Sequence, residues 1–418
     1  MDFNKAILDA VNDFDRMLSK YDKNSYTYKY AQSVRNLYTG LHEIPLRGNL
    51  FLIIKNLIGT VLRVFFIKPV LQNPAETILI EFNIEQDRYI ANRLNVPVAK
   101  FIGERYFCIG NIEYVLKWFI VSIRLLLSKD LEKKYVMRAL SSMLYGVHVY
   151  KHISLKNVKK IITQQDRYPF ELAIIEKAKS LGIKTIKYDF FPFFYDLGYD
   201  TINCDYYFYA NNITKRTFES SGKNDNVRFF ETGFPFWDYY AEDTGEFPDN
   251  NEKIVTFCTQ HGFEKGAFGP KGPSFYIEEI INALPDNYIL YIKMHPLDNY
   301  KNYLKFESKK VKIVKHGEID NRTIFKKSSF IFSIMSSVIY QAKHICPRSY
   351  FINYYPCEGA NAGYEFVTEY IDLITNRAEL EKVLLNKKAP KDQNTFIKFF
   401  NPNYPHTIHK MKELIKAL

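Results

Sequence analysis

The stretch YILYIKMHPL, residues 288–297, decides how the rest of the chain is interpreted. Its apolar and aromatic residues predict a buried β-strand that stops at Pro296. Two side chains that can carry positive charge, Lys293 and His295, come at the carboxyl end of this strand. Ligands of open α/β sheets bind outside the carboxyl ends of the strands. The stretch therefore indicates a binding site for an anionic group.

A second strand and the helix after it indicate the same kind of site. Residues 330–333 (FIFS) predict a strand, and Ser336 and Ser337 precede a helical pattern over residues 338–344. Backbone N–H groups and the dipole at a helix start favour anions, so we expect a phosphate or diphosphate there. The alternative is structural: His295 caps the strand, and the two serines are ordinary N-cap residues.

Length and composition indicate a globular protein of two domains. The chain has 418 residues, of which 47% are hydrophobic and 25% charged, and 57 basic against 46 acidic residues give a net charge of +11. A chain of this length exceeds one ordinary core. A basic surface suits nucleic acid, anionic lipid or a phosphorylated substrate. No recognition helix, RNA-binding motif or Arg-rich repeat is evident, so we expect no nucleic-acid partner.

Cysteine usage and hydropathy bear on the compartment. The five cysteines are scattered without a CxxC pair, which argues against a disulfide framework or a zinc site and fits a reducing cytoplasm. The N-terminus does not resemble a signal peptide, and no run of eighteen uncharged apolar residues predicts a spanning helix. Two basic apolar stretches, residues 49–71 and 114–127, are either buried helices or a face that rests on a membrane surface.

Strands and helices alternate along most of the chain. Residues 1–72 are predicted to be helical, as are 112–127, 131–145 and 169–181, with Gly182 as a helix C-cap. The first set of predicted strands is 77–82, 96–102, 158–163, 183–188, 205–209 and 227–231. A second set is 254–258, 288–293, 311–314, 329–333 and 350–353, with helices over 274–284, 338–344, 377–385 and, broken near Pro402 and Pro405, over 394–418.

This alternation predicts two α/β domains, each a doubly wound, Rossmann-like parallel sheet. We place the first domain at residues 1–240, with a helical N-terminal extension, and the second at 252–392. An acidic linker covers 241–252, and a helical tail, 393–418, is expected to pack back on the first domain. Two such halves imply a ligand cleft between them.

Several motifs occur in an order that resembles a known class of enzymes. They are Gly-x-Pro-x-x-Asp (Gly233, Pro235, Asp238), Thr-Gln-His-Gly (259–262), Lys-x-His-Pro (293–296) and the Ser-Ser pair. From about residue 155 to 370 the chain resembles bacterial GT-B glycosyltransferases that build surface polysaccharides. The most similar groups are capsule-type sialyl-, polysialyl- and Kdo-transferases, and CDP-glycerol polyol-phosphate transferases share a similar C-terminal half.

The resemblance implies that the second domain binds a nucleotide-sugar donor. His295 would contact the donor phosphate and contribute to catalysis, and Ser336 and Ser337 would hold the same phosphate. The donor-binding residues would be Thr259, Gln260, His261, Gly262, Lys293, His295, Pro296, Ser336 and Ser337. The chain departs from many relatives after the 183–188 strand, where it has Asp189 and two phenylalanines in place of Gln-His-Gly, and it lacks the acidic-acidic-Gly base motif.

An inverting transfer requires a general base that takes the proton from the acceptor hydroxyl. Asp166 and Asp189 each follow a predicted strand of the first domain and are the main candidates, with Glu171 and His261 next. Each carboxylate could equally be a helix N-cap or part of a salt bridge. Polar neighbours of Asp166, namely Gln165, Arg167 and Glu171, are expected to bind the acceptor.

We therefore expect an inverting glycosyltransferase that needs no metal and no cofactor, since Lys293, His295 and a helix start could stabilise the leaving phosphate. The expected donor is a CMP-activated acidic sugar, and the acceptor is a capsule or lipopolysaccharide glycan, free or lipid-linked. The enzyme would be cytoplasmic and peripheral to the inner face of the membrane. The alternatives are a polyol-phosphate transferase, a nucleotide-sugar epimerase and a non-catalytic glycan-binding subunit.

Overall fold

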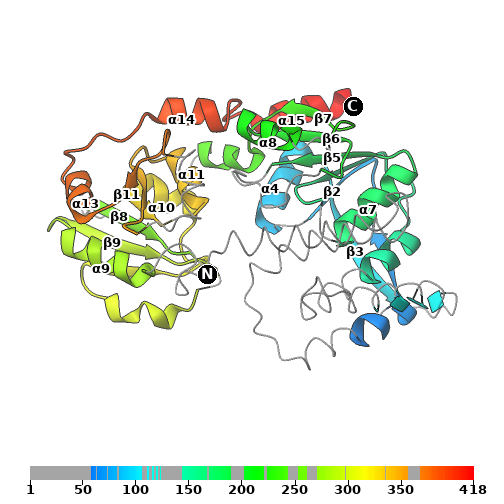
Figure 1. The fold of residues 1–418 in the computed structure, drawn as a ribbon, viewed down its shortest axis with the longest axis horizontal. Coiled ribbons are helices and arrows are strands. Elements are labelled where there is room, and N and C mark those ends of the chain that lie inside the picture. The colour runs from blue at the N-terminus through cyan, green and yellow to red at the C-terminus, as the bar shows by residue number, and fades with distance from the viewer. Residues whose placement is uncertain are drawn as a thin grey trace. The chain divides into compact units, whose positions relative to one another are not determined.

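The computed structural model describes residues 58–62, 64–72, 74–81, 84–105, 111–112, 115–116, 119–120, 123, 144–166, 169–189, 202–220, 224–242, 253–260, 271–296, 298–334, 336–355 and 368–418. These residues fall into two compact units (Figure 1). The first comprises the described residues up to 189, residues 202–231 and 411–418, and the second comprises residues 232–410. The second unit thus begins at Thr232, ahead of the linker predicted at 241–252, of which 243–252 lie outside the described residues.

The first unit is built on a seven-stranded sheet in the order β1-β3-β2-β4-β5-β6-β7. Six of its strands are parallel, and β1 pairs antiparallel with β3 at one edge. Its elements are β1 (Ile67–Gln72), β2 (Thr77–Ile80), α4 (Ile84–Leu94), β3 (Val98–Arg105), a helix over 144–152, β4 (Lys160–Thr163), α7 (Pro169–Ser180), β5 (Lys184–Tyr188), β6 (Tyr206–Tyr209), α8 (Asn212–Ser220) and β7 (Arg228–Glu231).

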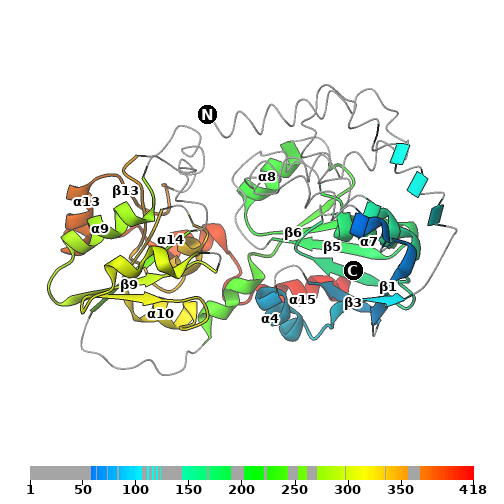
Figure 2. The ribbon, with the colours of Figure 1, turned by 90° about the horizontal axis from the view of Figure 1, so that it is seen from below.

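The helices of the first unit cover both faces of this sheet. Figure 2 shows α4 and α7 on opposite faces. The chain moves along the sheet in one direction from β2 to β3 and in the other direction from β4 to β5. Because crossovers between parallel strands are right-handed, the helices of these two connections must lie on opposite faces. The core on the α7 side joins β2, β4 and α7 through buried aliphatic residues such as Ile78, Ile161 and Ile174. Residues 411–418, most of which belong to α15 (Thr407–Ala417), complete the unit (Figure 2). Lys160 Nζ donates to the carbonyl of Ile415, and Lys184 Nζ donates to that of Leu418.

One predicted helical region is wrong at its end. The sequence pattern predicts helix over residues 1–72, but Ile67–Gln72 form the edge strand β1, and residues 1–57 lie outside the described part of the chain. Pro69 lacks a backbone N–H, and an edge strand tolerates that loss where a central strand does not. The mixed apolar and basic pattern of this stretch does not separate a helix from a strand of this kind.

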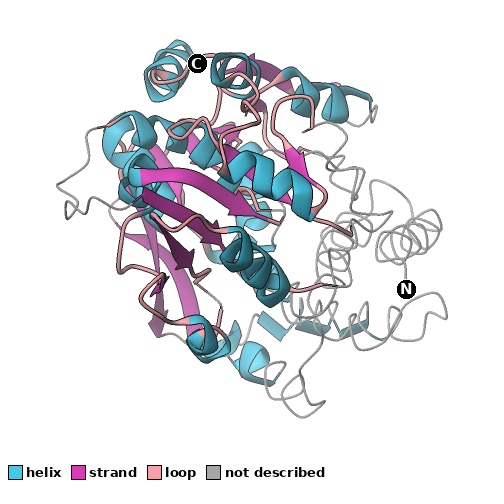
Figure 3. Ribbon diagram, turned by 90° about the vertical axis from the view of Figure 1, so that its left-hand side faces the viewer, coloured by secondary structure: helices cyan, strands magenta, loops and turns pink. Residues whose placement is uncertain are grey.

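The second unit contains a six-stranded, wholly parallel sheet in the order β10-β9-β8-β11-β12-β13. Figure 3 shows these strands side by side between helices. Its elements are η2 (Pro235–Ala241), β8 (Lys253–Cys258), α9 (Pro273–Ala283), β9 (Tyr288–Lys293), η4 (Tyr300–Asn302), η5 (Leu304–Phe306), β10 (Val311–Val314), α10 (Asn321–Lys327), β11 (Ser328–Ser333), α11 (Val338–Lys343), β12 (Ser349–Ile352), β13 (Leu373–Ile374), α13 (Arg377–Leu384) and α14 (Gln393–Phe400).

Residues 288–293 of the stretch quoted first form β9, which lies between the edge strand β10 and the central strand β8. All six residues of β9 are buried, as expected for a strand covered on both faces. Counted in chain order within the unit, the strands run 3-2-1-4-5-6, which is the strand order of the Rossmann fold. The order reverses between β8 and β11, so the ligand crevice of such a sheet falls at the carboxyl ends of these two strands.

Candidate active site

Three neighbouring strand ends bring the predicted donor-binding residues together in the second unit. Cys258 at the end of β8 pairs in register with Lys293 of β9, and Ser333 Oγ of β11 donates to the carbonyl of Cys258 over 2.9 Å. Gln260, His295 and Ser336 each follow one of these strand ends within three residues. The predicted donor-binding residues that the structure describes therefore lie at the carboxyl ends of β9, β8 and β11, and the strand order reverses between the last two.

A hydrogen-bonded turn fixes the backbone of His295. The hydroxyl of Thr259 accepts a bond of 2.8 Å from the backbone N–H of His295 and itself donates to the carboxylate of Asp298. The same Asp298 oxygen accepts from the hydroxyl of Tyr303 over 3.1 Å. The Thr259 hydroxyl thus stabilises the turn at His295, in addition to its predicted contact with the donor. The roles of Asp298 and Tyr303 were not predicted, because nothing in their sequence spacing links them to Thr259 at the carboxyl end of β8.

Lys293 stabilises a turn of the backbone, a role that its position in the sequence did not predict. Lys293 is 5% exposed, and its Nζ donates to the carbonyls of Ile319 at 2.8 Å and Lys315 at 3.5 Å. The ammonium group therefore holds the turn between β10 and α10. To contact the donor as predicted, the Lys293 ammonium group would have to keep these two hydrogen bonds and use its third N–H, or give one of them up.

The two serines lie at the start of α11, as predicted. Ser336 Oγ accepts a long bond of 3.4 Å from the backbone N–H of Val338, while Ser337 occupies the N-cap position without a side-chain cap bond. Helix α11 has only six residues, so its dipole contributes less than the sequence pattern suggested. A ligand at this position would therefore be bound mainly by the hydroxyl groups of Ser336 and Ser337 and less by the helix dipole.

The end of β8 carries a polar atom that lacks a partner. Gln260 Oε1 is buried and accepts no hydrogen bond from any residue that the structure describes. Buried polar groups in native proteins are nearly always hydrogen-bonded, so an unpaired oxygen at a sheet's ligand-binding edge indicates a place for a ligand donor group. Pro296 is exposed beside His295. His261, Gly262 and Arg167 lie outside the described residues, so their predicted roles stay predictions.

The two main candidates for the base, Asp166 and Asp189, are fully buried in the first unit and hydrogen-bonded on both carboxylate oxygens. Asp166 pairs with Lys187 Nζ at 2.7 Å and accepts from the backbone N–H of Asn203 at 2.6 Å. Asp189 accepts from the hydroxyl of Tyr207 and from the backbone N–H of Ala210. These contacts join the ends of neighbouring strands. They favour a structural role for both residues, although their catalytic role stays a prediction.

The residues predicted to bind the acceptor differ in their surroundings. Gln165 is half-buried, and its Oε1 accepts from the backbone N–H of Asp166 at 3.1 Å. Glu171 lies in the first turn of α7 and is buried, and this burial raises its carboxyl pKa to about 7. A carboxyl group with such a pKa can exchange a proton at neutral pH, which suits general base catalysis.

The Gly-x-Pro-x-x-Asp motif has a structural explanation. Gly233 has φ = +102°, and a Cβ placed there would lie 1.8 Å from Asn401 Oδ1. That oxygen accepts from the backbone N–H of Phe234, and Asp238 Oδ2 accepts from the backbone N–H of Ile408. Pro235 opens η2. The motif thus anchors the segment between α14 and α15 to the start of the second unit.

Comparison with solved structures identifies the fold. A protein assigned as a UDP-N-acetylglucosamine 2-epimerase from Listeria monocytogenes is 13% identical, with 83% of this chain and 96% of that chain covered and a TM-score of 0.53. MnaA from S. aureus, solved with UDP, is 13% identical, with coverage of 82% and 96% and a TM-score of 0.51. A variant of the wall teichoic acid polymerase TagF is 14% identical, with coverage of 92% and 97% and a TM-score of 0.49.

Sequence comparison adds no closer relative. No protein-family model matches the chain, and neither does any curated protein. At these identities the structural likeness establishes the fold alone. It confirms the predicted fold class, α/β with two Rossmann-like parallel sheets of the GT-B type.

Proposed function

We propose that this chain is a glycosyltransferase that moves a sugar from a nucleotide-activated donor to a hydroxyl group of a surface glycan. The observation that carries the proposal is the reversal of strand order between β8 and β11, with polar residues from three strands gathered there. Such switch points are where open α/β sheets bind nucleotides. The solved structures of similar fold support this choice, because one of them was determined with UDP.

In the proposed donor complex, His295 contacts the phosphate next to the sugar, and Ser336 and Ser337 donate their hydroxyls to the same group. Gln260 Oε1 accepts from a hydroxyl of the ribose or an amino group of the base, which would satisfy its unpaired state. The acceptor oxygen attacks the anomeric carbon, the bond from that carbon to the phosphate oxygen breaks, and the electron pair leaves on the phosphate. His295 stabilises this developing charge.

The donor nucleotide and sugar form the finer part of the proposal. The motif resemblance favours a CMP-linked acidic sugar, transferred to a capsule or lipopolysaccharide glycan without a metal. A polyol-phosphate transferase of the same fold would break a phosphorus–oxygen bond instead and leave phosphorus in its product. An epimerase would convert one nucleotide sugar into its epimer without any acceptor. Analysis of the products therefore separates these three activities.

Binding to the inner membrane surface is part of the same proposal. None of the helices within the described residues has the length and apolar composition that crossing a bilayer requires. Large apolar residues, each between 40% and 57% exposed, occur in the two basic stretches named above: Ile58, Leu62, Phe66, Leu116, Phe119, Ile120 and Ile123. Ile112, just before the second stretch, is 46% exposed. Exposed apolar groups next to basic residues suit an anionic lipid surface.

The test begins with binding. Thermal-shift measurements with CMP, CDP, UDP, GDP and their sugar conjugates should identify a nucleotide that stabilises the chain, and radiolabelled transfer with that donor should follow. His295→Ala should lower donor affinity or rate by roughly tenfold or more, as loss of one charge-assisted hydrogen bond does. His409→Ala, an exposed histidine of α15, is the matched control. Unchanged affinity and turnover in His295→Ala would contradict the donor site.

A further inference from the structure

The first sheet has its own reversal of strand order. Its six parallel strands, counted in chain order, run 2-1-3-4-5-6, so the order reverses between β2 and β4. Helix α4 follows β2 and α7 follows β4, and the two helices leave toward opposite faces of the sheet (Figure 2). Their first turns therefore flank the carboxyl ends of β2 and β4, where a crevice is expected in this topology.

A glutamine at this point presents an unpaired acceptor. Gln164 directly follows β4 and is buried, and its Nε2 donates to Asp87 Oδ1 of α4 at 2.7 Å. The hydroxyl of Tyr188 donates to the same oxygen. The amide group of Gln164 therefore faces Asp87 with its nitrogen. Oε1 is then left buried, with no hydrogen-bond partner in the described part of the chain.

The second unpaired acceptor belongs to Glu171 in the first turn of α7. Glu171 precedes Ile174 and Ile175 on the core-facing side of this helix and is 8% exposed. Its Oε2 has no hydrogen-bond partner among the described residues. Burial raises its pKa to about 7, opposed only by a hydrogen bond from its own backbone N–H. The other ionisable groups at this edge, Asp87, Asp189 and the Asp166–Lys187 pair, are all engaged in hydrogen bonds.

We propose that the carboxyl ends of β2 and β4 bind the polyhydroxylated acceptor, with its hydroxyls donating to Gln164 Oε1 and Glu171 Oε2, and that Glu171 takes the proton of the attacking hydroxyl. Gln164 Oε1 accepts hydrogen bonds, and the Glu171 carboxylate accepts them once it has lost its proton. The ligand should therefore supply O–H groups, which a neutral saccharide or polyol surface carries and a phosphate dianion does not. The proton moves to the Glu171 carboxylate as the new carbon–oxygen bond forms. This inference rests on the proposed transfer reaction.

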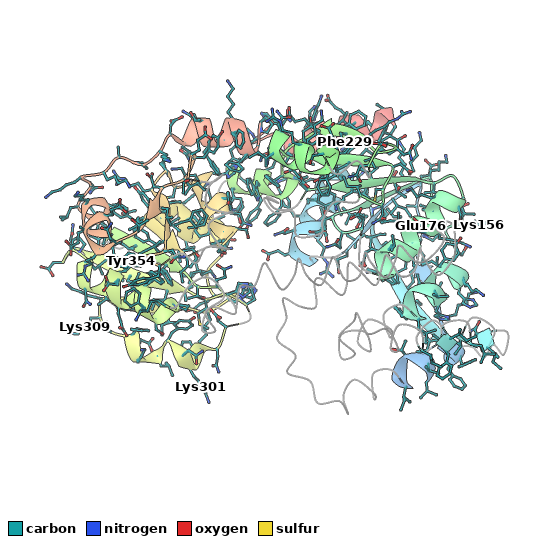
Figure 4. The ribbon with its side chains drawn as sticks, in the orientation of Figure 1. Lys156, Glu176, Phe229, Lys301, Lys309 and Tyr354 are labelled. Atoms are coloured by element: carbon teal, nitrogen blue, oxygen red, sulfur yellow. The ribbon has the colours of Figure 1, made fainter. Side chains whose placement is uncertain are left out.

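Three variants test the role of Glu171. Glu171→Gln keeps the shape but cannot take a proton, Glu171→Asp retracts the carboxylate, and Glu176→Gln changes an exposed residue of the same helix (Figure 4). Transfer should fall on the order of 10²–10⁴-fold in Glu171→Gln, with donor affinity unchanged, and Glu176→Gln should match the wild type. The rise of rate with pH through about 7 should disappear in Glu171→Gln and remain, at a lower rate, in Glu171→Asp.

A second readout is independent of activity. Infrared difference spectra between pH 5 and pH 9 should show a protonated carboxyl band that titrates near 7 in the wild type and is absent in Glu171→Gln. Full transfer activity in Glu171→Gln, or the same titrating band in that variant, would overturn the assignment of Glu171. A wild type that binds none of the nucleotides would instead overturn the proposed function, so the two failures are distinguishable.

Discussion

Replacing Glu171 by glutamine should change how the stability of the chain depends on pH. The carboxyl pKa is about 7 in the folded protein against an ordinary value of 4.5, because burial penalises the charged form. Below pH 4.5 the carboxyl group is neutral in both the folded and the unfolded state, so it does not change the free energy of unfolding. As the pH rises from 4.5 to 7, the unfolded chain releases the proton first, so the folded state loses stability.

The size of this effect follows from the two pKa values. The difference between 4.5 and about 7, at about 1.36 kcal/mol per unit, corresponds to about 3 kcal/mol. Glu171→Gln removes the titration while it keeps the shape. Its free energy of unfolding, relative to the wild type, should therefore increase by about 2–3 kcal/mol between pH 5 and pH 8.

Urea unfolding followed by circular dichroism at pH 5 and pH 8 measures this difference. Glu176→Gln, which alters an exposed side chain of α7, should show no comparable change between the two pH values. The reasoning would be refuted if Glu171→Gln and the wild type lost stability in parallel from pH 5 to pH 8. That result would mean that Glu171 is hydrated or paired in the folded protein.

Four further outcomes are expected. Asp166→Asn should destabilise the fold by about 3–5 kcal/mol in urea unfolding, since it removes the carboxylate charge that pairs with the buried ammonium group of Lys187; a loss below 1 kcal/mol would contradict this. Gly233→Ala should lower the melting temperature strongly, because its Cβ would overlap Asn401 and its φ is +102°. Transfer should persist in excess EDTA, and loss that Mg²⁺ or Mn²⁺ restores would count against a metal-independent mechanism. Binding to anionic vesicles in sedimentation assays should weaken as salt rises, and equal recovery without vesicles would exclude a membrane face.

Much of the fold could be predicted because its strands are buried on both faces. A strand covered by helices on either side is a continuous apolar run, and such a run over residues 288–292 matches β9. The strand predicted at 311–314 matches the edge strand β10, although Lys312 within it is exposed. The helix predicted at 169–181 corresponds to α7, and Gly182 has the positive φ of a C-cap, +71°. The edge strand β1 lacks such a run, which explains its misassignment.

The surroundings of the site residues could not be predicted, because they depend on register between distant strands. Thr163 pairs with Lys187 across β4 and β5, and this register brings the ammonium group of Lys187 to Asp166. Likewise, the contact between Thr259 and the His295 turn requires β8 and β9 to lie side by side. The position of a polar residue after a strand could be predicted from the sequence, whereas its hydrogen-bond partners, and therefore its chemical role, could not.

The first unit is assembled from separated parts of the chain, and this has a consequence for its synthesis. Residues 411–418 belong to it, yet a ribosome makes them only after the whole second unit. Until then, the amino groups of Lys160 and Lys184 at the starts of β4 and β5 lack the carbonyls of Ile415 and Leu418. The first unit therefore lacks these two hydrogen bonds while the second unit is being made. Final closure of the first unit is expected to follow translation of α15, so the part of the chain made first is completed last.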